Sequence, residues 1–323
     1  MVKVKEFVGI DISKLTFDVG IPTSQDRHYK HGKYDNNKEG FAALKQILPL
    51  DCVCVMEASG PYYMGLANYL YVEGIEVRVV NPLAVKHFSR MRMTRAKTDK
   101  KDAALIAEYA KSENPPVWKP KAQHLIELQQ LQSVLEGFVT RKTQLQNQYE
   151  ALSSSGFKKS SALVILKKEI KHVTSAIEAI EKQMEKITQT YHQNMFKQLQ
   201  SIPGIGKRTA MLLIVITDGF TRFETAKQLV GYVGLCPRIY DSGTSVKGKQ
   251  KICKMGMASV RTLLYMCAMQ AKRYNQSCIQ MFARLKAKGK NGKLIIVALA
   301  NKLLKQAFAV ATQCKYYEPQ LVA

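Results

Sequence analysis

The sequence has 323 residues, of which 46% are hydrophobic, and it carries 49 Lys plus Arg against 25 Asp plus Glu, a formal charge of +24. This composition excludes a disordered chain and favours two or three domains that bind a polyanion, because Lys and Arg release counterions from phosphates. No apolar run approaches the roughly 20 residues of a membrane span, the start MVKVKEFVGI lacks a signal-peptide core, and seven cysteines without a CxxC pair support neither a disulfide framework nor a zinc ribbon. We therefore expect a cytoplasmic protein with no membrane partner.

The first 120 residues alternate between strand-like and helix-like patterns. Strand patterns cover 7–12 and 15–21 around the turn-prone Ser13-Lys14, and a more polar run covers 27–34. A helical pattern at 38–48, an apolar run at 52–56, a helix at 62–72 and a strand at 76–80 follow. This order predicts an α/β domain with a mixed sheet over residues 1–120.

Four acidic residues in this region are candidates for one catalytic site. Asp11 closes the first strand, Glu57 follows the apolar run CVCVM, and Asp99 and Asp102 share one face of a predicted helix. Such a cluster repels itself unless a divalent cation neutralises it, and oxygen ligands select Mg²⁺, with Mn²⁺ as the other candidate. Taken singly, each acid also has an ordinary explanation as a turn, cap or first-turn residue. A neighbouring basic run suits an incoming phosphate backbone and includes Arg90, Arg92, Arg95 and Lys97.

Residues 121–198 have the apolar spacing of two long helices. Leucine, isoleucine and other apolar residues recur at alternating steps of three and four on both sides of SSSG at 153–156. The spacing predicts a coiled-coil linker or oligomerisation region. It does not decide between a hairpin within one chain and a seam between protomers.

The third region, 199–323, opens with LQSIPGIGKRTA and is mainly helical in pattern. Pro203-Gly204-Ile205-Gly206 before a helix is typical of a helix-hairpin-helix, in which backbone N–H groups meet a DNA phosphate. Lys207 and Arg208 favour this interpretation over a plain glycine-rich turn.

Residues 242–317 contain no Asp or Glu but fifteen Lys plus Arg. An ordinary solvated surface mixes both signs of charge, so we expect this stretch to contact nucleic acid. The cations nearest its start are Lys247, Lys249, Lys251, Lys254 and Arg261.

Five segments together resemble the transposases of the insertion sequence one-ten family, relatives of the Piv-type DNA invertases. They are VGIDISK, VMEASGPYY, NPLAVKHFSRMRMTRAKTDKKDAALIAEYA, LQSIPGIGKRTA and LVGYVGLCPRIYDSGTSVKGKQKICKMGMASVRTLLYMCA, in matching order and spacing. The resemblance implies a RuvC-like domain with an RNase H fold, whose DEDD set falls on Asp11, Glu57, Asp99 and Asp102. It implies further a coiled-coil region and a C-terminal transposase domain whose nucleophilic serine falls on Ser242.

The resemblance also implies partners and a mechanism. Members of the family are understood as bacterial recombinases guided by a bridge noncoding RNA that pairs with target and donor DNA. They act as tetramers assembled from dimers, with composite sites made of the RuvC-like domain of one protomer and the serine domain of another. The chain would thus be nucleoid-associated when bound.

The residues themselves leave alternatives to Ser242 open. Most loop serines in a DSGT turn are structural, but Ser242 stands where acids disappear and beside Gly243, which permits close backbone approach. All six histidines precede residue 200, so a metal held by the acids would have to assist the serine, and a tyrosine recombinase using Tyr240 is disfavoured. The alternatives are a RuvC-like junction nuclease or resolvase without a covalent intermediate, an actin-like or sugar-kinase ATPase, and an RNA chaperone with a vestigial catalytic domain.

Overall fold

The computed structural model describes residues 5–23, 28–93, 98–154, 156, 160–238, 241–242, 246–247 and 251–319. Contacts divide the chain into two compact units, Met1–Pro120 and Lys121–Ala323. The predicted boundary at 120 coincides with this division, whereas residues 121–198 and 199–323 fall in one unit.

The first unit is built on a five-stranded mixed sheet with the order β3-β2-β1-β4-β5. Three strands form a meander, namely β1 (Glu6–Ile12), β2 (Thr16–Pro22) and β3 (Tyr29–Asp35), and each neighbouring pair is antiparallel. Strands β4 (Cys52–Glu57) and β5 (Glu76–Val80) add to β1 in parallel. The expected mixed α/β architecture is confirmed, and it is compatible with a RuvC-like domain.

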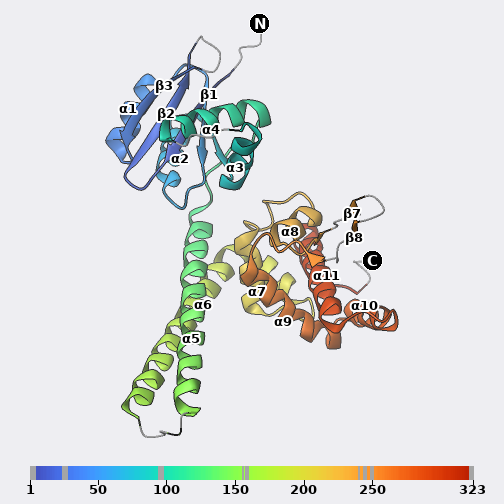
Figure 1. Cartoon of the computed structure of the whole chain (residues 1–323). Coiled ribbons are helices and arrows are strands. Elements are labelled where there is room, and N and C mark those ends of the chain that lie inside the picture. Colours follow the sequence, from blue (N-terminus) through green and yellow to red (C-terminus); the bar gives the residue numbers. More distant parts are fainter. Residues whose placement is uncertain are drawn as a thin grey trace. The chain divides into compact units, whose positions relative to one another are not determined.

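Helices cover both faces of this sheet (Figure 1). On one face α1 (Lys38–Ile47) and α2 (Tyr63–Val72) bury Phe41, Leu44 and Leu66 against the apolar side of β1 and β2. On the other face α3 (Pro82–Met91) and α4 (Asp99–Glu113) pack on Val53, Val55 and Val80. Alternation along each strand thus separates two cores, because successive side chains point to opposite faces.

Two glycines let α4 lie unusually close to the sheet. Gly9 of β1 and Gly20 of β2 are partners in the antiparallel register. A methyl group on Gly9 would lie 2.6 Å from the backbone nitrogen of Ala107, and one on Gly20 would lie 3.1 Å from that of Ala104. The helix backbone therefore occupies the space that a side chain would need at Gly9.

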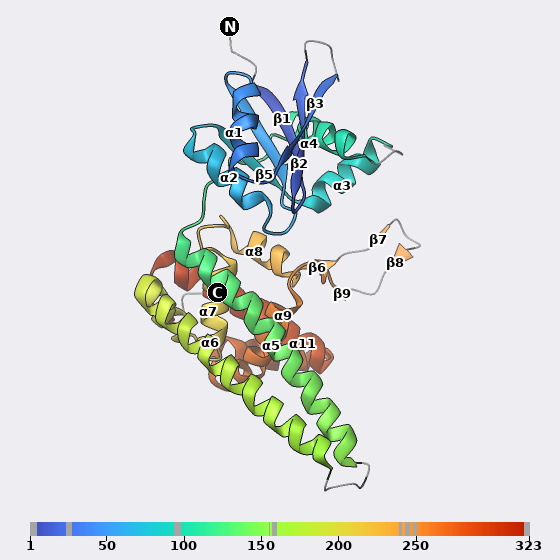
Figure 2. The same ribbon diagram turned by 90° about the vertical axis from the view of Figure 1, so that its left-hand side faces the viewer.

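The second unit begins with two long helices, α5 (Gln123–Ser154) and α6 (Ser161–Gln200), which lie side by side in both views (Figures 1 and 2). Leu128, Leu135 and Val173 are buried, as the apolar spacing predicts for a helical pair. The two helices pack against each other within one chain. At His192 the backbone of α6 is non-helical, and His192 Nε2 lies 3.1 Å from His124 Nε2 of α5.

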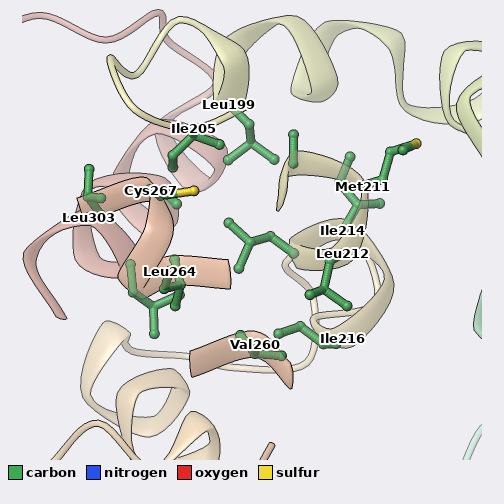
Figure 3. Close-up of a cluster of buried hydrophobic side chains, with 14 of the residues drawn as sticks. Leu199, Ile205, Met211, Leu212, Ile214, Ile216, Val260, Leu264, Cys267 and Leu303 are labelled. Atoms are coloured by element: carbon green, nitrogen blue, oxygen red, sulfur yellow. The ribbon is translucent and has the colours of Figure 1, made fainter. Parts of the chain in front are cut away.

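The remainder of the second unit is mainly helical, as expected. It contains α7 (Lys207–Ile216), α8 (Ala226–Val233), α9 (Ala258–Tyr274), α10 (Gln276–Ala287) and α11 (Gly292–Gln313). Figure 3 shows how Leu199 at the end of α6, Ile214 of α7 and Leu264 of α9 meet in one core. Buried residues of α5 and α6 belong to this same core, so the long helices and the C-terminal helices stabilise one another.

Helix α11 is long and apolar enough to cross a membrane by length and composition alone, and 56% of that stretch is buried inside the structure. Leu299, Leu303 and Ala307 belong to the core of the second unit, and α11 packs on α9. Its apolar composition is therefore that of a core helix.

Candidate active site

Two of the predicted acids lie on neighbouring strands and on the same face of the sheet. Glu57 is the last residue of β4, and Asp11 is the last but one of β1. Ile10 and Met56 are partners in the parallel register, which places Asp11 and Glu57 at the next position of each strand. Since Ile10 and Met56 point into the core below α1 and α2, the two acids point to the opposite face, where α4 packs.

The third acid, Asp102, is carried to that face by α4. Thr98 caps this helix by accepting a hydrogen bond from the backbone of Lys101, and Asp102 is in the first turn. Asp102 stands four residues before the buried Ile106, so both lie on one side of the helix. The close approach of α4 at Gly9 therefore sets the height of Asp102 above the sheet. Asp99 begins α4, but its side chain lies outside the described residues.

The donor chemistry of these residues fits a hard divalent cation, because carboxylate oxygens are the ligands that Mg²⁺ and Mn²⁺ prefer. Among the side chains that the structure describes, no three His, Cys, Asp or Glu gather closely enough to hold a metal ion. Asp11, Glu57 and Asp102 each have an interaction with a neighbour. The three acids are thus brought to one face of the first unit without forming a closed ligand set by themselves.

A buried acid that the sequence analysis missed lies beside this face. Asp18 of β2 is the register partner of Asp11, and it is only 6% exposed. Its carboxylate is paired with two residues of β3, His31 at 2.6 Å and Lys33 at 3.9 Å. The signal in the sequence was an aspartate inside the otherwise apolar strand pattern TFDVGI. Asp18 therefore adds negative charge next to Asp11, and β3 supplies its counter-charge.

In the sequence, the basic residues predicted near the acids fall at the end of α3 and in the stretch that leads to α4. Arg90 and Arg92 are exposed at the end of α3, and the Arg92 guanidinium stacks on the Phe88 ring at 5.2 Å. Lys100 and Lys101 are exposed in the first turn of α4. Arg95 and Lys97 lie outside the described residues. Exposed cations thus precede and follow the segment that leads to Asp102.

The glycine-rich hairpin belongs to the second unit and joins α6 to α7. Gly204 has a φ of 106°, and a methyl group there would lie 2.9 Å from the Cys267 carbonyl oxygen of α9, so this glycine is required by packing. Gly206 is the exposed N-cap of α7. Lys207 forms an ion pair with Glu185 at 2.7 Å, and Arg208 forms one with Glu181 at 3.4 Å. The two cations predicted to meet phosphate are therefore paired with acids of α6.

Ser242 lies between α8 and α9 in a segment with two short strand pairs, which we call the serine ribbon. Strand β6 (Pro237–Arg238) pairs with β9 (Lys251–Ile252), and β7 (Asp241–Ser242) pairs with β8 (Val246–Lys247), with Ser242 opposite Val246. The base of the ribbon is fixed because Cys253 donates its backbone N–H to Cys236 O at 2.8 Å. The side chains of Ser242 and Lys247 lie outside the described residues, as do Tyr240 and Lys249.

Three other residues of this region that were predicted to contact nucleic acid are among the described residues, namely Lys251, Lys254 and Arg261. Lys251 and Lys254 are exposed near the base of the ribbon, whereas Arg261 donates to Val233 O at 2.9 Å and so braces α8 against α9. Among the described residues from 251 to 315, no Lys or Arg forms an ion pair. This contrasts with Lys207 and Arg208, and it leaves the charge of these helices available to an external polyanion.

Comparison with known proteins identifies both parts of the chain. Residues 8–157 match a DEDD transposase domain, and residues 196–283 match the domain described as transposase of the IS116/IS110/IS902 family. The chain is 32% identical to the pilin gene-inverting protein of Moraxella lacunata, over 98% of this chain and 99% of that protein. It is 27% identical to the transposase for insertion sequence element IS1111A of Coxiella burnetii, over 97% and 91% of the two chains. It is also 24% identical to the transposase for IS1328 of Yersinia enterocolitica, over 95% and 96%. Matches of this length, in both parts of the molecule, show that the chain belongs to the IS110 family of transposases, enzymes that recombine DNA.

Proposed function

We propose that the protein is a bridge-RNA-guided recombinase of an insertion sequence, which cleaves and exchanges DNA strands through a covalent bond to Ser242. The observation that carries the proposal is the placement of Asp11, Glu57 and Asp102 on one face of the first unit, beside exposed cations. Its second support is the separate ribbon of the second unit that bears Ser242. The acids of the first unit and the serine of the second unit therefore have separate roles in the proposed reaction.

In this proposal the acids hold Mg²⁺ and the serine conserves the phosphodiester. Asp11, Glu57 and Asp102, joined by Asp99, are the residues that would bind the ion, and the ion would supply charge stabilisation at the scissile phosphate. Ser242 Oγ attacks that phosphate, an Oγ–P bond forms, and the P–O bond to one strand end breaks, releasing a hydroxyl. The hydroxyl of the incoming strand reverses these events. Recombination then needs no external energy source, because the ester retains the bond that hydrolysis would lose.

Nucleic-acid recognition is assigned to two sets of cations. Arg90, Arg92, Arg95 and Lys97 are assigned to the strand that is cleaved at the acids. The Lys and Arg of α9, α10 and α11, which form no ion pair among the described residues, are assigned to backbones of DNA or RNA. Backbone contacts carry no sequence information, so base pairing by the guide RNA would choose target and donor sites. The active form would be a tetramer of paired dimers, with each site shared between protomers.

The first test is the metal and the acids. Asp11→Asn, Glu57→Gln and Asp102→Asn should abolish DNA cleavage while leaving RNA binding nearly unchanged, and EDTA should have the same effect on the parent chain. His28→Gln, on the same unit, is a matched control that should cleave normally. Full cleavage in EDTA would refute a metal-dependent site.

The second test is complementation between protomers. Chains with Asp11→Ala and chains with Ser242→Ala should each be inactive, but their mixture should recover cleavage where an intact acidic face meets an intact serine. A mixture that stays inactive would contradict the shared site. A junction nuclease that uses water would instead keep cleavage with Ser242→Ala.

A further inference from the structure

A cavity of about 470 Å³ lies between the base of the serine ribbon and helices α10 and α11. Its apolar lining is formed by Leu235, Pro237, Ile252, Met281, Leu294, Val297 and Ala298. Its polar lining consists of Lys251, Arg284, Asn301, Lys302 and Lys305, without an acidic residue. The volume lies within the range of roughly 300–1,000 Å³ that is typical of small-molecule sites.

The walls of the cavity are fixed by hydrogen bonds. Asn301 Nδ2 of α11 donates to Leu235 O at 3.2 Å, which ties the helix to the segment that enters the ribbon. Pro237 and Ile252 face each other as register partners in the β6–β9 pair. The cavity is therefore formed in the free chain, so binding would not have to order its walls.

The cavity is close to Ser242 along the chain. Pro237, which lines the cavity, is five residue steps from Ser242, and a fully extended chain spans at most about 3.6 Å per residue, or about 18 Å in all. This is roughly five steps of duplex DNA at about 3.4 Å each. A strand whose phosphate reaches Ser242 can therefore place a nearby nucleotide at the cavity.

We propose that this cavity binds one unpaired nucleotide, with its base on the apolar floor and its flanking phosphates on the cations. Bases taken out of a stack are held by apolar side chains and by contacts to the flanking backbone, and this lining offers both. The cavity lining has four cations and no acid. A nucleic-acid backbone carries a negative charge on every phosphate, whereas a protein segment carries carboxylates at some positions only, so the lining matches a phosphodiester better. The inference rests on the proposed function for the role of Ser242, but nucleotide binding itself needs no cleavage.

The test measures binding of a short single-stranded DNA with one 2-aminopurine, and of the same sequence as RNA, to the full chain carrying Ser242→Ala. The fluorescence of this base changes when it leaves its stacked neighbours. Ala298→Leu, which fills the cavity, should weaken binding about tenfold. Leu294→Glu should do the same, and because Leu294 is 47% exposed this change does not disturb a core. The matched control is Leu152→Glu on α5, at a residue that is 40% exposed.

The cations give a second readout. Lys302→Ala with Lys305→Ala should lower the slope of log affinity against log salt by about 1.4 and abolish the fluorescence change. Lys288→Ala with Lys290→Ala removes equal charge outside the cavity lining, and it should keep the fluorescence change. A response to the DNA probe alone assigns the site to the cleaved strand, and a response to the RNA probe alone assigns it to the guide.

Unchanged binding by both Ala298→Leu and Leu294→Glu would overturn the inference, as would equal binding of a probe that lacks the base. Because these titrations use a chain without Ser242, their outcome is independent of the covalent step. Failure to find a protein–DNA adduct in the parent chain would refute the proposed function and leave the nucleotide site standing.

Discussion

Replacing Gly9 by Ala tests whether the spacing between α4 and the sheet controls the acidic site. The added methyl group would overlap the Ala103 carbonyl oxygen and lie 2.6 Å from Ala107 N, whereas ordinary van der Waals contact begins at 3.4 Å, so α4 must move by more than about 0.8 Å. Overpacking of this kind costs about 1–3 kcal/mol of unfolding free energy. A shift near 1 Å at a catalytic group lowers a rate by about 10²-fold. We therefore expect Gly9→Ala to lose about 10²-fold in cleavage while the chain remains folded.

The assay pairs cleavage of a DNA substrate with calorimetric unfolding of the same samples. Gly65→Ala is the matched control, since its methyl group would meet the Phe41 ring at an ordinary 3.5 Å on the opposite face of the sheet, within helix α2. This control should cleave normally, and alanine in a helix should stabilise it by up to about 1 kcal/mol. Parent-level cleavage by a folded Gly9→Ala chain would show that the position of Asp102 above the sheet does not matter.

Two further predictions concern the second unit. Burial and the neighbouring His124 lower the pKa of His192 below its usual 6.5. Below about pH 6.5 the unfolded chain therefore binds more protons than the folded chain. The stability that is present above this pH is lost as the pH falls toward the lowered pKa. Urea unfolding at pH 7.5 and 5.5 should show this loss, and His192→Gln should reduce it; equal pH dependence in the variant would contradict the assignment. Glu185→Gln releases Lys207 from its ion pair and should tighten DNA binding at low salt, whereas Glu169→Gln, which releases Arg141 instead, should not. Unchanged affinity with Glu185→Gln would show that Lys207 serves only to join α7 to α6.

The order of elements in the first unit followed from the sequence because each pattern was local. The run at 76–80 is β5 with the same bounds, and the helix predicted to carry Asp99 and Asp102 is α4. The face shared by Asp11 and Glu57 could also be anticipated, since two strand ends in a mixed sheet meet at one edge. The sequence pattern does not predict how closely α4 approaches the sheet. That distance depends on the pairing of Gly9 on β1 with Gly20 on β2.

Contacts between distant segments account for the other differences. Asp18 is an acidic residue inside a strand pattern, and only the pairing of β2 with β3 shows that His31 and Lys33 balance its charge. Lys207 and Arg208 had the local setting of phosphate ligands, but the return of α6 beside α7 brings Glu185 and Glu181 to them. Gly204 fits a phosphate-binding hairpin in sequence, whereas its close contact with α9 is a tertiary feature.

In the proposed mechanism, strand exchange passes through an ester between Ser242 and a DNA phosphate. The measurement is mass spectrometry of the peptide that remains bound to DNA after reaction with a suicide substrate, whose cleaved end cannot religate. We expect an adduct on Ser242 in the parent chain and none with Ser242→Ala, although DNA and RNA binding persist in that variant. An adduct on Tyr240, Ser245 or any other residue, or cleavage without an adduct, would contradict it.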